Sequence, residues 1–130
     1  MTPEQIELAQ RLVKHPAFKW SAGMRAIDKD GHRWRILANI GCPGHHAQGE
    51  EHAGYTSGWE TIADLLGAVP DLTDPATVGC LLALAREVLG DSRLCVAPVL
   101  YTWQWTIFPG DHPLAPTEGE ALALAILGAA

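Results

Sequence analysis

Residues 41–58 hold the side chains best suited to chemistry. The segment reads GCPGHHAQGEEHAGYTSG and combines a thiol, three imidazoles and adjacent carboxylates without helical or strand periodicity. Thiolate, imidazole and carboxylate groups can together complete the tetrahedral coordination of Zn²⁺. A zinc site in a small metal-dependent enzyme is therefore one hypothesis for this segment. Its candidate ligands are Cys42, His45, His46 and His52, with Glu50 and Glu51 beside them.

The spacing of these residues departs from established zinc motifs. The segment contains no CxxC pair and no HExxH helix, and His46 and His52 stand six residues apart. A solvated Gly-rich loop explains the same composition, and its histidines would then hold added metal only weakly. A loop of this length is uncommon in a small domain and is usually functional or disordered. We therefore expect no obligatory cofactor, with Zn²⁺ as the alternative.

Other catalytic signatures are missing from the sequence. It contains no GxSxG, no GxxxxGK[ST] phosphate-binding loop and no GxGxxG. Cys42 and His45 could act as thiol and base, but a Pro-Gly link separates them and no residue is placed to orient the base. The sequence favours a binding protein over an enzyme.

Five tryptophans, at positions 20, 34, 59, 103 and 105, stand out in a chain of 130 residues. In a small domain, indole rings usually complete the core, and we expect this of Trp34 and of either Trp103 or Trp105. Aromatic side chains beside loops are instead typical of binding hot spots. The sequence therefore predicts Trp59, Tyr101 and Trp103 as interaction anchors.

Positive charge gathers in the first 35 residues, which hold seven of the nine Lys and Arg against four acidic residues. The net charge of −6 thus divides into +3 for this segment and −9 for the remainder. Arg25, Arg33 and Arg35 could bind phosphate or an acidic partner. Pairing with the acidic remainder of the chain is the alternative. Overall acidity disfavours nucleic acid as the main ligand.

Capping and turn residues divide the chain into helices and hairpins. Thr2, Asp74 and Thr117 are N-cap candidates, and Asp30-Gly31 is a preferred pair for a tight hairpin turn. The expected elements are helices at 3–14, 75–89 and 117–127 and strands at 24–28, 33–40, 94–99 and 103–108. Residues 60–69 fit either a short helix or a third strand. This order predicts an α+β fold, with a small antiparallel sheet of two hairpins packed on three helices and the helix at 75–89 central.

Length and composition limit the class of protein further. A chain of 130 residues suits one domain, here residues 1–130 with the long loop at 41–58. At 48% hydrophobic and 18% charged residues, we expect a soluble globular protein without a membrane segment. The start of the chain does not resemble a signal peptide, and three widely spaced cysteines suit reduced thiols. These features predict a cytoplasmic location.

Three stretches carry a resemblance to a known family. They are His15–Arg25, which contains HPAFKWSAGMR, Pro70–Glu87, which contains PDLTDPATVGCLLALARE, and the closing helix Thr117–Leu127. Together they cover about half of the chain, and they resemble a family of small, mostly uncharacterised proteins encoded by tailed bacteriophages and prophages. The resemblance implies an accessory protein acting in the cytoplasm of a bacterial host, and it supplies no catalytic residues.

Two classes of function follow from these observations. The first is an accessory protein that binds a host or phage macromolecule, with inhibition of a bacterial defence system as one form of that binding. An acidic surface could, for example, occupy a basic nucleic-acid channel of its partner. The second is the small metal-dependent enzyme that uses residues 41–58. A structural component of the virion, which would form homo-oligomers, is a further alternative.

Overall fold

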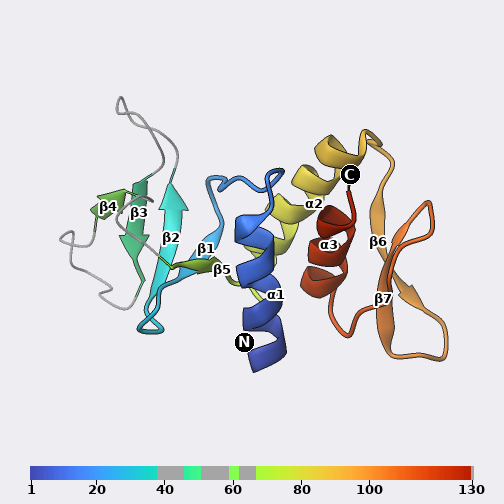
Figure 1. Ribbon diagram of the computed structural model, residues 1–130, viewed down its shortest axis with the longest axis horizontal. Coiled ribbons are helices and arrows are strands. Elements are labelled where there is room, and N and C mark those ends of the chain that lie inside the picture. Colours follow the sequence, from blue (N-terminus) through green and yellow to red (C-terminus); the bar gives the residue numbers. More distant parts are fainter. Residues whose placement is uncertain (38–45, 51–58, 62–66, 130) are drawn as a thin grey trace.

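Three helices separate two antiparallel sheets in the computed structural model of the chain, which describes residues 1–37, 46–50, 59–61 and 67–129 (Figure 1). The helices are α1 (Pro3–Lys14), α2 (Pro75–Leu89) and α3 (Glu118–Leu127). The five-stranded sheet has the order β4 (Trp59–Thr61), β3 (His46–Gly49), β2 (Arg33–Leu37), β1 (Arg25–Ile27) and β5 (Val69–Pro70). The second sheet is a hairpin of β6 (Cys95–Val99) and β7 (Gln104–Phe108). The α+β fold with three helices and antiparallel strands is confirmed.

The three helices begin where their capping residues predict. Thr2 and Gln5 form a reciprocal capping box, Asp74 accepts a hydrogen bond from the Thr77 backbone N–H, and Thr117 accepts one from the Glu120 backbone N–H. Gly90 ends α2 in the left-handed conformation with a φ of 65°. In the part of the chain that the structure describes, no helix is both long enough and apolar enough to cross a bilayer.

The expectation for residues 41–58 was wrong in one respect, because the segment contains a strand. β3 lies between β2 and β4, and Ala47 is buried opposite Ile36 of β2. Its sequence, HAQG, has little intrinsic preference for strand, so pairing with β2 rather than local propensity forms it. Residues 60–69 were expected to form either a helix or a strand. Strands are found at both ends of this segment, β4 and β5, and residues 62–66 lie outside the residues that the structure describes.

The two predicted hairpins form, but they do not belong to one sheet. β1 and β2 extend into the five-stranded sheet, whereas β6 pairs only with β7 within the described residues. The two sheets lie on opposite sides of the helices (Figure 1). Ile107 of β7 is buried, and β7 packs against α3, so the hairpin has one face on the core and one facing out.

The centre of the core is α3 rather than the helix at 75–89. Seven of its ten residues are buried, and it contacts α1, α2, β6 and β7. Small residues permit these close approaches. At Gly119, an added Cβ would collide with the backbone carbonyl of Leu72, which is itself buried. In α1, Leu8, Ala9 and Leu12 are buried, whereas Ile6 is 39% exposed.

We predict that Gly119→Ala lowers the free energy of unfolding by about 2 kcal/mol, because the new methyl group meets backbone that cannot move aside. The matched control is Gly79→Ala in α2, where nothing lies within reach of the added methyl group. There the higher helix propensity of alanine should raise stability by about 0.5–1 kcal/mol. Urea denaturation of both variants measures the difference, and effects of the same sign would contradict this packing of α3.

Candidate functional site

The turn of the β6–β7 hairpin carries the largest exposed side chains of the described residues. We call residues 100–103 the hairpin tip. Leu100 is 78% exposed, Tyr101 is fully exposed and Trp103 is 97% exposed. Of the two tryptophans between which the sequence left the choice open, Trp105 packs against the core and Trp103 lies in solvent. Two of the three predicted anchors, Tyr101 and Trp103, are therefore exposed on one turn.

The backbone of the hairpin tip is held in a conformation that its residues disfavour. Tyr101 has a φ of 68° and Trp103 a φ of 55°, in the left-handed region that bulky residues rarely adopt. Thr102 fixes the turn, because both its backbone N–H and its hydroxyl donate to the Val99 carbonyl, at 3.3 and 2.9 Å. Each bulky residue in the left-handed conformation costs the fold on the order of 1 kcal/mol. Tyr101 and Trp103 therefore do not stabilise the turn.

A hollow of about 660 Å³ lies against the hairpin tip. Its walls include the exposed rings of Tyr101 and Trp103, the half-buried ring of Trp105, and the side chains of Pro98 and Val99. Pockets of about 300–1,000 Å³ commonly bury drug-sized molecules, so this one has room for an aromatic side chain. The tip thus presents both projecting rings and a recess.

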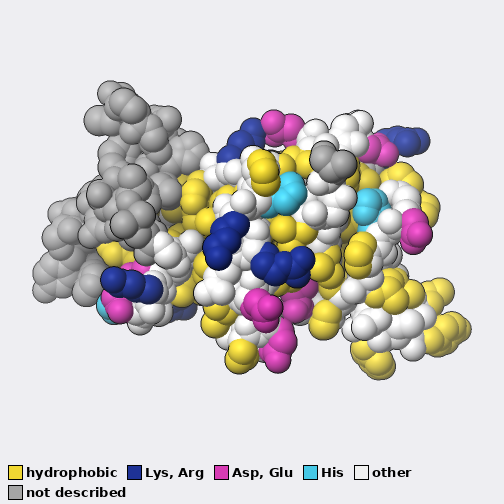
Figure 2. Space-filling view, in the orientation of Figure 1, with side chains coloured by type: hydrophobic (Ala, Val, Ile, Leu, Met, Phe, Trp, Pro, Cys, Tyr) yellow, Lys and Arg dark blue, Asp and Glu magenta, His cyan; other side chains and the backbone are white. Residues whose placement is uncertain are grey.

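Residues 94–110 contain no acidic or basic residue and no histidine. Figure 2 shows the result on one face of the molecule, where the end that holds the hairpin turn (lower right) carries only hydrophobic and uncharged side chains. The chain also has no Lys or Arg after Arg93. Stacking on nucleic acid and binding to anionic lipid both depend on nearby positive charge, which this surface lacks.

Two of the three arginines predicted to bind an acidic partner, Arg25 and Arg35, form ion pairs at the end of the molecule opposite the hairpin (Figure 1). Arg25 donates from Nε to Glu50 Oε2 at 2.7 Å, and Arg35 donates from Nε to Glu50 Oε1 at 2.9 Å. Arg35 Nη1 also lies 2.8 Å from Asp74 Oδ2, and Arg25 Nη1 lies 3.4 Å from Asp71 Oδ2. These five side chains form a charge network that joins β1, β2 and the end of β3 to the start of α2.

The charge network accounts for the internal pairing that the sequence left as an alternative for Arg25 and Arg35. Arg33 lies on β2, as does Arg35. Together with Arg25 and Arg35, it lines an open hollow of about 460 Å³. Two guanidinium groups and three carboxylates largely neutralise one another there, which leaves little field to attract an anion. Binding of an acidic partner by these arginines stays a prediction.

Asp74 is the most deeply buried acid of the charge network, with 5% of its side chain exposed. Burial alone would raise the pKa of this carboxyl, but hydrogen bonds from Arg35 and from Thr77 outweigh it and hold the pKa below the ordinary value. The same carboxylate caps α2. One side chain therefore fixes both the helix start and its attachment to the sheet.

Most of the candidate zinc ligands lie outside the residues that the structure describes. Cys42, His45 and His52 lie there, and His46 is described only through its backbone in β3, where it pairs with Leu37 and Thr61. Trp59, the third predicted anchor, is likewise described only through its backbone in β4. The zinc site and the role of Trp59 stay predictions.

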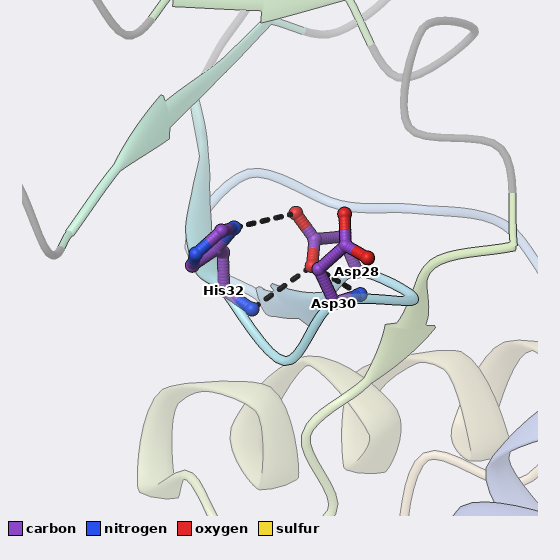
Figure 3. A group of neighbouring side chains, drawn as sticks. All are labelled: Asp28, Asp30 and His32. Carbon is purple, nitrogen blue, oxygen red and sulfur yellow. Dashed lines mark hydrogen bonds and ion pairs between the residues drawn. The ribbon is translucent and has the colours of Figure 1, made fainter.

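Asp28, Asp30 and His32 form the one cluster of possible metal ligands among the described residues (Figure 3). Asp28 Oδ1 accepts hydrogen bonds from the backbone N–H groups of Asp30 and His32, both at 2.9 Å, and Oδ2 accepts one from Trp34 Nε1 at 3.0 Å. Burial works against ionisation of Asp28, yet these bonds hold its pKa below the ordinary value. The Asp28 carboxylate is thus already used in shaping the β1–β2 turn, and the cluster needs no metal to explain it.

The described cysteines show no sign of an activated thiol. Burial raises the pKa of the Cys80 thiol, which disfavours the reactive thiolate, and Cys80 Sγ contacts the Ala22 carbonyl at 3.5 Å. Cys95 is a free thiol that is exposed on the outward face of β6.

Searches of family models, curated proteins and solved structures found no match to this chain.

We predict that Asp74→Asn lowers the free energy of unfolding at pH 7 by about 2–4 kcal/mol, because Arg35 loses its buried partner while asparagine can still cap α2. The folded-state pKa of Asp74 lies below 3.8, so its stabilising effect is full above that pH and is lost as pH falls through the folded value. Thermal unfolding between pH 7 and about pH 2.5 measures this.

The stability of Asp74→Asn should therefore fall less steeply in acid than that of the wild type. Asp111→Asn, at an exposed position in the loop after β7, is the matched control and should behave as wild type. Equal acid sensitivity of Asp74→Asn and wild type would show that the ion pair contributes little.

Proposed function

We propose that this chain is an interaction protein that binds another protein through the hairpin tip. The observation that supports it most is the full exposure of Tyr101 and Trp103 on a turn whose backbone both residues disfavour. Tyrosine and tryptophan are enriched among the residues that dominate binding energy. The hydrogen bonds from Thr102 to Val99 fix the backbone of the turn, which lowers the entropy cost of binding.

The charge distribution favours a protein as the partner. The hairpin tip lacks the basic residues with which proteins hold phosphates of nucleic acid or of anionic lipid. Addition of a strand to the edge of β6 is also disfavoured, since Pro98 has no backbone N–H to donate. Insertion of side chains into an apolar recess is the mode of binding that remains.

The resemblance to tailed-phage proteins supports a bacterial host or phage protein as the partner, met in the bacterial cytoplasm. Inhibition of a bacterial defence system is the form of this binding that we propose to test first. Such an inhibitor needs a binding surface and no catalytic residues, which agrees with the absence of catalytic motifs from the sequence.

The experiment compares three forms of the protein immobilised in bacterial lysate: wild type, Tyr101→Ser/Trp103→Ser, and Ile6→Ser. Ile6 is a partly exposed apolar residue on α1, so its substitution matches the loss of apolar surface at a different place. We expect a protein retained by wild type and by Ile6→Ser to be lost from the tip variant by tenfold or more. Quantitative mass spectrometry of the retained proteins provides the measurement.

Circular dichroism must first show that the tip variant is folded. The same proteins retained equally by all three forms would contradict the proposal, because the hairpin tip would then contribute nothing to binding. Retention lost equally in both variants would contradict it too, since any loss of apolar surface would suffice.

A further inference from the structure

We infer that the hairpin tip pairs with the tip of a second copy of this chain, giving a two-fold symmetric dimer in which Trp103 of each copy enters the hollow of the other. This inference rests on the proposed function in one respect, namely that the tip is a binding surface. It differs in the occupant, because a second copy would cover the rings that a host or phage protein would otherwise contact.

The exposed surface of the tip supplies a large part of the area that a stable dimer needs. Tyr101 and Trp103 together expose on the order of 400 Å² of aromatic surface. Leu100 and the half-exposed Val99 and Gln104 extend it. Interfaces of standard size bury about 800 Å² on each partner. Patches above a few hundred Å² rarely stay exposed on a monomer.

The charges favour a second copy over a partner of opposite charge. Each chain carries −6, so two copies repel wherever their acidic surfaces face each other. Residues 94–110 are uncharged, which makes the hairpin a place where two copies can meet without burying a charge or opposing like charges. Binding to a basic partner would instead be favoured by acidic residues at the tip, and the tip has none.

The hairpin tip carries both a projecting ring and a recess. Two-fold pairing requires that one surface hold both the projection and its receptor. Trp103 projects and forms one wall of the recess, whose volume is about 660 Å³ and whose other walls include Pro98, Tyr101 and Trp105. The Gln104 side chain, on the outward face, can offer a donor and an acceptor to the Trp103 indole N–H or the Tyr101 hydroxyl of the other copy.

The test is the mass of the protein in solution, measured by sedimentation velocity from about 1 to 100 µM. We expect wild type to approach twice the 14.0 kDa of one chain as concentration rises. Trp103→Ser should raise the dimer dissociation constant by at least about tenfold. Ile6→Ser, which removes apolar surface from α1 instead, should dimerise as wild type.

A wild type that stays monomeric at about 100 µM would overturn the inference. So would a dimer that Trp103→Ser leaves intact, because another face would then hold it together. The outcomes also separate this inference from the proposed function. If the wild type is monomeric but the tip variant still loses a protein bound from lysate, the tip binds another protein and the dimer is ruled out. If the wild type is monomeric and the tip variant loses no bound protein, both the dimer and the proposed function are ruled out.

Discussion

The fold depends on how closely its other elements can approach α3. This helix consists mainly of glycine, alanine and leucine, and its buried residues face two helices and the β6–β7 hairpin. Gly119 lets the backbone at Leu72 lie against the helix at the point where α2 is about to begin. A two-stranded hairpin is only marginally stable alone, so β6 and β7 owe their order to this packing. The same packing covers only one face of the hairpin and leaves the other face and the tip in solvent.

The molecule therefore has two ends of different character. At one end the charge network holds the five-stranded sheet to α2, and Arg25 and Arg35 are largely neutralised by Glu50, Asp71 and Asp74. At the other end the hairpin carries no charge over residues 94–110. Ion pairs thus serve chiefly the fold, and in the proposed function binding falls to the aromatic side chains. This separation leaves an acidic protein with a neutral surface at the hairpin.

Local signals predicted much of this arrangement, and long-range contacts account for what was missed. Thr2, Asp74 and Thr117 mark the helix starts because a cap depends only on residues within one turn. β3 was not predicted because pairing with β2, rather than a local preference of its residues, forms this strand. Arg35 and Asp74 are 39 positions apart, so no spacing rule could pair them. The uncharged aromatic run was visible in the sequence, but periodicity could not show that Trp103 faces solvent while Trp105 faces the core, because a left-handed backbone at Trp103 ends the alternation.

The central claim is that Tyr101 and Trp103 serve binding at a cost to the fold. The most direct test is the free energy of unfolding of Tyr101→Asn/Trp103→Asn, measured at a protein concentration too low for self-association. Asparagine tolerates the left-handed backbone better than either aromatic residue. We predict that the variant is as stable as wild type or more stable, by up to about 2 kcal/mol. A loss of 2 kcal/mol or more would contradict it, because the two rings would then be supporting the fold.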